Sequence, residues 1–278
     1  MIAAERGSYV EVDGLRTYYL KLDSGLQVGS GPPVVLIHGA SPGACSLVAW
    51  QRNVEPLAAA GFTVYAFDQP GFGHTDNPAD HSIEYRVAHA RAFLDTLGLA
   101  RFHLVGNSVG GYIAARIALD DPRVERLVST TSGTLAPRGS AQSQAQCQQH
   151  SDDLAGYEPG LDNMRALTQT TFFDQTLVTD DVVRLRYELS IGKNYEAQLG
   201  RVKAVRPRRL DDDLPRLRVP TLLLWGQNDA GVSVERGLLL FQLIPGAEFH
   251  LFDRCGHWVQ WDQAARFNAV VAGFLRAG

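Results

Sequence analysis

Short runs of apolar residues recur along the chain, with polar and turn-forming segments between them. Residues 34–37 (Val-Val-Leu-Ile) form a continuous apolar run, which is typical of a strand covered on both faces of a parallel sheet. Similar runs predict further strands at residues 63–67, 102–105, 127–128, 221–225 and 248–252. Upstream, residues 9–12 and 17–20 flank the dipeptide Asp13-Gly14, which favours a tight β-hairpin.

Helical patterns separate these predicted strands. Between residues 83 and 97, apolar side chains recur every three or four positions, Ser82 can cap the start of the helix and Gly98 can end it. Strand and helix patterns alternate in this way on both sides of residue 108. This alternation predicts an α/β fold with a mostly parallel, doubly wound sheet.

The alternation stops in residues 134–213. Residues 139–150 are rich in Ser, Gln and Ala, and sheet-type runs are missing until residue 221. Helix-like segments follow near residues 163–173 and 180–190. We therefore interpret residues 134–213 as a helical lid inserted into a core made of residues 1–133 and 214–278. The alternative interpretation is that these helices belong to the core.

Composition and charge exclude several classes of protein. A chain of 278 residues, 45% hydrophobic and 20% charged, has the composition of a globular protein of one large domain, or of a core with an inserted subdomain. A net charge of −4 gives no basic surface for nucleic acid. No apolar run reaches the roughly 18 residues of a membrane span. Residues 1–6 lack the positive and apolar regions of a secretory signal.

The three cysteines are Cys45, Cys147 and Cys255, and their wide spacing matches no metal-binding pattern. We expect them to be reduced thiols in a cytoplasmic protein. Neither a metal ion nor an organic cofactor is implied by the sequence.

The segment from Gly106 to Gly110 carries the clearest chemical motif. The predicted strand at residues 102–105 stops abruptly at Gly-Asn-Ser-Val-Gly and leads into a helix-like segment at residues 112–119. This arrangement predicts a nucleophile elbow, in which Ser108 occupies a strained turn and its hydroxyl projects above the sheet. A serine in an ordinary turn is the alternative.

A serine hydroxyl needs a base to become nucleophilic, and the base needs an orienting acid. In this class of fold the order along the chain is serine, acid, histidine. His257 lies just past the last predicted strand, whereas the other seven histidines are worse placed. Asp229 lies just past the strand at residues 221–225, so Ser108, Asp229 and His257 are the predicted triad. Asp253 is the alternative acid, although it precedes His257 by only four positions.

Backbone N–H groups are expected to form the oxyanion hole that completes such a site. One N–H belongs to Val109, directly after the nucleophile. The other comes from the small, turn-forming loop after His38, where Ala40 is the first choice and Ser41 the second. His38 itself is expected to order that loop.

Together these motifs resemble a known family. They are His38-Gly-x-x-Pro42-Gly43-Ala44, Gly106-Asn107-Ser108, Trp225-Gly-x-x-Asp229, Cys255-Gly-His257-Trp258 and Phe173 to Leu177. From about residue 34 onward the chain resembles the meta-cleavage product hydrolases, which have the α/β-hydrolase fold and cleave carbon–carbon bonds in aromatic degradation of the biphenyl and carbazole type. Three features make the resemblance specific: Asn107 next to the serine, Trp258 next to the histidine, and the segment from Phe173 to Leu177.

The resemblance implies a small-molecule substrate of the 2-hydroxy-6-oxohexa-2,4-dienoate type, cleaved to 2-hydroxypenta-2,4-dienoate and a carboxylic acid. It implies that Asn53, Asn107 and Arg186 hold the dienoate end of the substrate, and that Trp258 lines the same side. Without the resemblance, Asn53 would be interpreted as a helix-start residue and Arg186 as a solvated charge. We also expect a homo-oligomer.

Two positions depart from the family pattern. Ser41 stands where the family usually has glycine, and Val109 replaces a bulkier apolar residue. Phe172, Phe173 and Leu154 can line the apolar part of the pocket. Two other functions stay open, namely a carboxylesterase that uses the same triad and a small-molecule receptor that keeps the fold.

Overall fold

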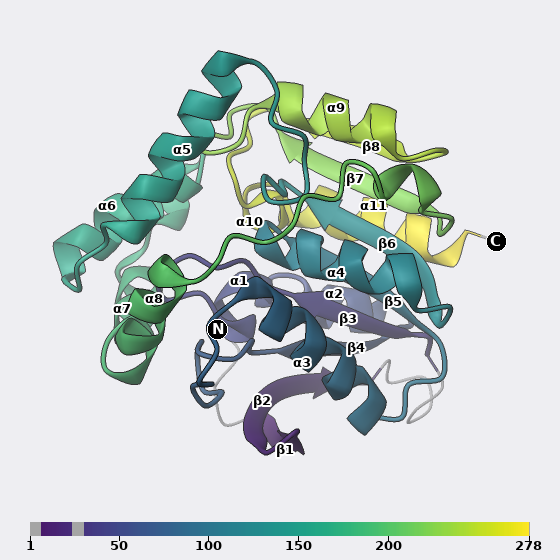
Figure 1. Cartoon of the computed structure of the whole chain (residues 1–278), viewed down its shortest axis with the longest axis horizontal. Coiled ribbons are helices and arrows are strands. Elements are labelled where there is room, and N and C mark those ends of the chain that lie inside the picture. Colours follow the sequence, from purple (N-terminus) through teal and green to yellow (C-terminus); the bar gives the residue numbers. More distant parts are fainter. Residues whose placement is uncertain (1–6, 24–30, 278) are drawn as a thin grey trace.

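A twisted, mostly parallel sheet forms the centre of the molecule (Figure 1). The computed structural model describes residues 7–23 and 31–277, so the N-terminal residues 1–6 lie outside it. The described residues contain eight strands: β1 (Ser8–Val12), β2 (Leu15–Leu22), β3 (Pro33–Ile37), β4 (Thr63–Phe67), β5 (Phe102–Asn107), β6 (Val124–Thr130), β7 (Thr221–Gly226) and β8 (Glu248–Phe252). Their order is β1-β2-β4-β3-β5-β6-β7-β8, and only the β1–β2 and β2–β4 pairs are antiparallel. The predicted α/β fold is confirmed.

The hairpin between β1 and β2 has the geometry that its sequence predicts. Asp13 and Gly14 have φ angles of 48° and 78°. Positive φ at both central residues is characteristic of the tight turns whose twist matches that of the paired strands.

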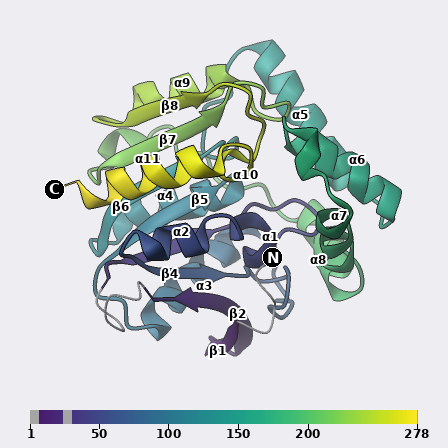
Figure 2. The ribbon, with the colours of Figure 1, turned by 180° about the vertical axis from the view of Figure 1, so that it is seen from behind.

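Helices cover both faces of the sheet, as Figures 1 and 2 show from opposite sides. The helices of the core are α1 (Ser46–Trp50), α2 (Val54–Ala59), α3 (Ile83–Thr96), α4 (Val109–Asp120), α9 (Val234–Leu243), α10 (Val259–Asp262) and α11 (Ala264–Arg276). Along β3, Val34 and Leu36 join the apolar cluster under α2 and α11, whereas Val35 and Ile37 join the cluster under α3 and α4. A strand buried on both faces therefore needs the unbroken apolar run seen in the sequence.

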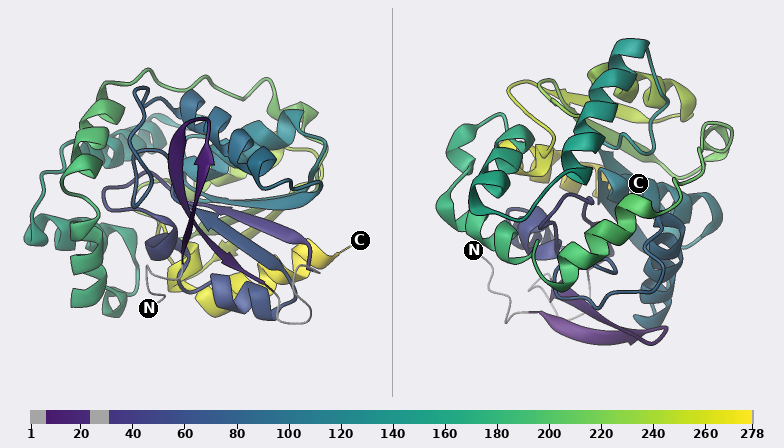
Figure 3. Two further views of the ribbon diagram at one scale, coloured as in Figure 1. Left: turned by 90° about the horizontal axis from the view of Figure 1, so that it is seen from below. Right: turned by 60° about the vertical axis from the view of Figure 1, so that its left-hand side comes forward.

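Residues 134–213, all of them described, carry four α-helices in place of strands. These are α5 (Ala141–Ala155), α6 (Leu161–Thr171), α7 (Asp180–Glu188) and α8 (Lys193–Lys203). We call them the inserted helices; Figure 3 shows them gathered at one end of the molecule. The sequence predicted α6 and α7 but neither α5 nor α8. Ser143 is the only buried residue of α5, so this helix has no apolar stripe for periodicity to detect.

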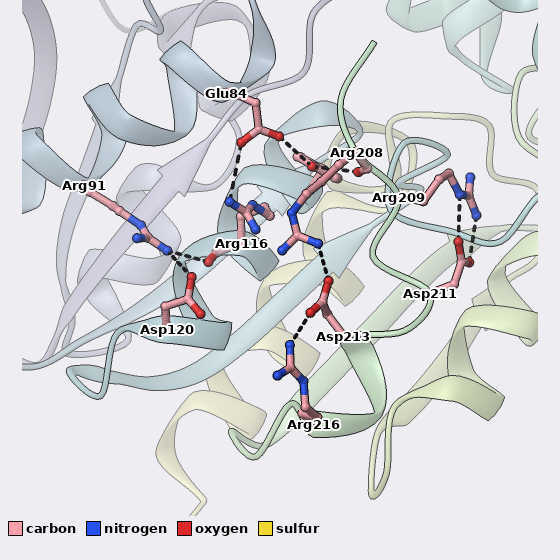
Figure 4. A network of polar contacts seen from close by, with 10 residues as sticks. Glu84, Arg91, Arg116, Asp120, Arg208, Arg209, Asp211, Asp213 and Arg216 are labelled. Atoms are coloured by element: carbon pink, nitrogen blue, oxygen red, sulfur yellow. Dashed lines mark hydrogen bonds and ion pairs between the residues drawn. The ribbon is translucent and has the colours of Figure 1, made fainter.

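A charged segment leads from α8 back to β7 and crosses the surface of α3 and α4 (Figure 4). The hydroxyl of Tyr112 lies 2.9 Å from the main-chain oxygen of Arg208 and 3.2 Å from Glu84 Oε1. Arg208 and Arg216 both contact the carboxylate of Asp213. Ion pairs at such exposed positions contribute little to stability, so we assign them the role of defining the path of the segment. Within the described part of the chain, no helix has the length and apolarity needed to cross a bilayer.

The helix α4 crosses β3 and β5 at backbone contact distance, which leaves no space for a side chain at two glycines. A Cβ on Gly110 would lie 2.1 Å from the main-chain oxygen of Ile37. A Cβ on Gly106 would lie 2.2 Å from the main-chain oxygen of Gly110. Because these neighbours are backbone atoms, a larger residue requires the helix or the strand to move.

We expect Gly110→Ala to lower the free energy of unfolding by about 3 kcal/mol, because the added methyl group displaces α4 from β3. Urea denaturation followed by circular dichroism measures the change. Gly273→Ala in α11 is the matched control. An added Cβ at Gly273 meets no atom within 4 Å, so this variant should gain roughly 0.5–1 kcal/mol. Equal effects of the two substitutions would contradict the proposed crowding at the crossing.

Candidate active site

Ser108 lies at the bend between β5 and α4, in the strained conformation that the motif predicts. Its φ of 54° and ψ of −120° are unusual for a residue other than glycine. Its N–H donates to Thr130 O at 2.9 Å, and its carbonyl accepts from Gly111 N at 3.0 Å and from Ser132 Oγ at 2.5 Å. Three hydrogen bonds therefore hold the bend from both sides.

Ser108 lines a cavity of about 50 Å³ at the carboxyl end of the sheet. The cavity lining comes from the loop after β3, the elbow, the inserted helices and the loop after β8. These residues are Gly39, Ala40, Ser41, Asn107, Ser108, Val109, His150, Leu154, Thr171, His257 and Trp258. Segments that are distant in the sequence meet here, as is usual at the carboxyl edge of an α/β sheet.

His257 and Asp229 form a buried hydrogen-bonded pair. His257 Nδ1 lies 2.8 Å from Asp229 Oδ2, and Asp229 Oδ1 accepts from the N–H groups of Gly231 at 2.8 Å and Val232 at 2.9 Å. These three hydrogen bonds fix the orientation of the Asp229 carboxylate. Asp253, the alternative acid, is exposed to solvent and has no contact with the histidine.

The main chain of His257 is fixed by two further segments. Its N–H donates to Thr171 O at 3.0 Å, and its carbonyl accepts from Thr131 Oγ1 at 2.7 Å. The described residues include no hydrogen bond between Ser108 Oγ and His257, although both line the cavity. Contacts of this kind frequently tighten only when a substrate binds.

Residues that can supply backbone N–H groups line the cavity from two elements. Val109 is the first residue of α4, so its N–H has no acceptor within the helix. Ala40 and Ser41 lie in the loop after β3, which approaches the elbow so closely that a Cβ on Gly39 would be 3.2 Å from Ser108 Cβ. The three residues expected to form an oxyanion hole therefore line the same cavity.

His38 orders the loop that contains Ala40 and Ser41, as the sequence suggests. Its Nε2 accepts from Gln69 N at 3.0 Å, and the Gln69 side chain donates to the main-chain oxygen of His38. Complete burial lowers the pKa of His38 to about 3, so the imidazole is neutral. A neutral ring can accept the Gln69 N–H, which a charged ring cannot.

Arg186, on α7, is fully buried beside the cavity. Its guanidinium donates to Thr168 Oγ1 at 3.0 Å, to Ser41 Oγ at 3.3 Å and to Pro42 O at 3.2 Å, and lies 5.2 Å above the ring of Trp258. Burial lowers its pKa to about 10. No carboxylate forms an ion pair with it among residues 7–23 and 31–277, and its Nε has no hydrogen-bond partner. An uncompensated buried cation of this kind is costly unless a ligand supplies the negative charge.

Asn107 and Trp258 also line the cavity, and the Trp258 ring lies next to Arg186. Asn107 Nδ2 donates to Thr131 Oγ1 at 3.2 Å, whereas its Oδ1 is buried in the cavity wall without a partner. Trp258 rests edge-on against Phe172, with ring centroids 5.6 Å apart. The residue that departs from the family pattern, Ser41, uses its hydroxyl to accept the hydrogen bond from Arg186.

Asn53, which is expected to hold the substrate, is not among the residues that line the cavity. Its side chain is fully buried, and Nδ2 donates to Gln260 O at 3.1 Å and to Asn268 Oδ1 at 2.9 Å. Asn53 directly precedes α2, and its side chain links α2 to α10 and α11. This position agrees with the helix-start residue that the sequence indicates when the family resemblance is left aside. Of the three apolar candidates, Leu154 lines the cavity, Phe172 packs behind Trp258, and Phe173 is 39% exposed.

His150, on α5, lines the cavity and was missed by the sequence analysis. Its ring centroid is 5.3 Å from that of His257, and the ring planes are tilted by 54°. Burial, with a smaller effect of His257, lowers its pKa to about 4. The sequence carried no signal for it, because α5 lacks apolar periodicity. The described residues contain no group of three or more His, Cys, Asp or Glu side chains arranged to hold a metal ion.

The sequence and the fold of the chain are similar to those of known hydrolases. Residues 32–264 match the alpha/beta hydrolase fold family. The chain is 36% identical to a 2-hydroxy-6-oxo-2,4-heptadienoate hydrolase from Pseudomonas putida, over 99% of this chain and 98% of the relative. It is 35% identical to a 2-hydroxy-6-oxononadienedioate/2-hydroxy-6-oxononatrienedioate hydrolase from Dechloromonas aromatica, over 94% and 91% of the two chains.

The solved structure of a meta-cleavage product hydrolase from Pseudomonas fluorescens IP01 superimposes with a TM-score of 0.84. It is 32% identical in sequence and covers 98% of each chain. These similarities agree with the eight-stranded sheet and with the bend at Ser108. The chain belongs to the α/β-hydrolase fold family and, within it, to the meta-cleavage product hydrolases.

Proposed function

We propose that this protein hydrolyses the C5–C6 bond of 2-hydroxy-6-oxohexa-2,4-dienoates, giving 2-hydroxypenta-2,4-dienoate and a carboxylic acid. The observation that carries the proposal is the buried, uncompensated guanidinium of Arg186 beside the cavity that contains Ser108 and His257. A simple ester brings no negative charge to this position, whereas a dienoate does. The names of the relatives, which are hydrolases of such dienoates, support the same substrate class.

Arg186 and Asn107 suit the dienoate end of this substrate. The carboxylate and the neighbouring 2-oxygen can accept paired hydrogen bonds from a guanidinium, which is the strongest arrangement for such groups. Asn107 Oδ1, which has no partner in the cavity wall, can accept a hydrogen bond from the 2-hydroxyl group and so orient its proton. Transfer of that proton to C5 converts the enol to the ketone and places an electron sink next to the C5–C6 bond.

Ser108 then attacks the C6 carbonyl carbon and transfers its proton to His257, while Asp229 holds the imidazole in orientation. The N–H groups of Val109 and Ala40 stabilise the negative charge that develops on the C6 oxygen. When the C5–C6 bond breaks, its electron pair passes into the conjugated ketone, and water hydrolyses the acyl group left on Ser108. Attack by water activated by His257 gives the same products, and the two routes differ in whether Ser108 becomes acylated.

The inserted helices, residues 134–213, act in this proposal as a lid. The cavity of about 50 Å³ has room for only one or two water molecules, whereas sites for small organic ligands usually span several hundred Å³. α5 and α6 supply His150, Leu154 and Thr171 to its lining. Substrate therefore requires these helices to move away from the core before it can bind.

Two further parts of the proposal concern the protein as a whole. We infer that it is a homo-oligomer, which is supported by the exposed apolar side chains of Leu238 and Phe241 on α9 and Leu251 on β8, each about two-fifths accessible. We also infer a cytoplasmic location, which is supported by its three unpaired cysteines.

Purified protein should convert 2-hydroxy-6-oxo-hexadienoates, and the loss of their visible absorbance measures the rate. Ser108→Ala should lower kcat at least about 1,000-fold, because the nucleophile is removed, while substrate binding is kept. Equilibrium binding to the variant, followed by absorbance, checks that the site is intact. Good hydrolysis of simple esters without turnover of any dienoate would make the protein a carboxylesterase instead.

Arg186→Gln should lower kcat/KM for dienoates by about 10- to 100-fold, because charged hydrogen bonds to the substrate are lost. Hydrolysis of p-nitrophenyl acetate by the same variant should change little, which shows that the triad is intact. Arg184→Gln is the matched control, since Arg184 is exposed on the same helix. Parallel losses of ester and dienoate hydrolysis in Arg186→Gln would point to a structural role.

Asp229→Asn should lower kcat by about 10³- to 10⁴-fold, because the amide cannot stabilise the imidazolium of His257. Asp253→Asn, which changes the alternative acid, should keep kcat within a factor of two. Both variants can be compared by dienoate turnover and by the rate at which a fluorophosphonate labels Ser108. A strong loss with Asp253→Asn and none with Asp229→Asn would reverse the assignment.

A further inference from the structure

The imidazole of His150 is held in a defined place next to the proposed catalytic pair. On the same helix, Gln146 Nε2 donates to the main-chain oxygen of Asp229 at 2.9 Å, which fastens α5 to the loop after β7. Gly231 in that loop has no side chain, and a Cβ there would lie 2.7 Å from His150 Cγ. The His150 ring therefore fills the space above Gly231 and lies beside His257.

His150 also has hydrogen-bonding capacity that the protein does not use. Among the described residues no hydrogen bond involves its ring nitrogens, although the side chain is half-buried and lines the cavity. The charged or titratable groups near it are His257, Asp229 and Asp153. Asp229 is occupied by His257, and Asp153 is exposed and bonded to Gln149. A polar ring in this situation is usually satisfied by a ligand or by water.

His150 and Arg186 lie on different sides of Ser108. Arg186 contacts Ser41 and the ring of Trp258, whereas His150 contacts Gly231 and His257. Their helices are likewise apart, with α7 next to α1 and α5 next to the β7–β8 end of the sheet (Figure 1). If the dienoate carboxylate binds Arg186 and C6 lies at Ser108, the substituent on C6 extends toward His150. This step rests on the proposed function.

We propose that His150 is a specificity-determining residue, which hydrogen-bonds a carboxylate at the end of a short chain on C6. Leu154 and Val109 also line the cavity and are suited to the methylene groups of such a chain. The ring N–H of His150 then pairs with the terminal carboxylate. A plain alkyl or aryl substituent would leave this N–H buried without a partner, and binding sites discriminate strongly against ligands that do so.

The test compares two substrates that share the dienoate end. They are 2-hydroxy-6-oxonona-2,4-dienedioate, which carries the terminal carboxylate, and 2-hydroxy-6-oxohepta-2,4-dienoate, which has only a methyl group on C6. Wild-type protein should show a kcat/KM at least about tenfold higher for the dioate. His150→Phe keeps a ring next to His257 but removes the donor. It should lower kcat/KM for the dioate by about 10- to 50-fold and leave the heptadienoate within a factor of two or three.

His150→Gln retains an N–H donor and should recover part of the loss on the dioate. Gln149→Leu, on the exposed side of α5, is the matched control and should behave like wild type on both substrates. Equal losses on the two substrates in His150→Phe, or a wild-type preference for the heptadienoate, would overturn the inference while leaving the proposed function intact. Absence of turnover with either substrate would overturn both.

Discussion

The bend at Ser108 is the constraint on which the rest of the site depends. A residue other than glycine in this conformation costs about 1–3 kcal/mol, so the surrounding structure must hold it there. It does so through the hydrogen bond to Thr130 O and through the contact of α4 with β3, which only glycine at position 110 permits. The same close contact brings the loop at Gly39 against the serine, and so places backbone N–H groups around it.

The proposed base is positioned in a different way, by contacts from several parts of the chain. The His257 ring is bonded to Asp229 after β7, its carbonyl to Thr131 after β6, and its N–H to Thr171 in the inserted helices. Each contact comes from a separate segment, and each is buried. The histidine therefore has a fixed position although it lies in a loop without regular structure.

Those parts of the molecule that repeat a local pattern could be predicted from the sequence. The bounds of β4 and β8 match the apolar runs, and Ser108, Asp229 and His257 each lie just beyond a strand, where side chains converge on one edge. The features that could not be predicted have no such local pattern. α5 is polar along most of its length, so His150 and its helix gave no signal, and the place of Asn53 depends on packing against α10 and α11 that no local pattern encodes.

The inserted helices do more than cover the cavity, because they hydrogen-bond to the main chain of both members of the proposed catalytic pair. Thr171 O accepts from His257 N, and the Gln146 side chain donates to Asp229 O. In the proposed lid, an outward movement of these helices that admits a substrate breaks both hydrogen bonds at once. If the helices move as proposed, the catalytic pair is fixed in place only after the substrate is enclosed, and selectivity then depends on whether the helices can close as well as on the shape of the cavity. Molecules too bulky for the helices to close over would then meet a catalytic pair that lacks both hydrogen bonds.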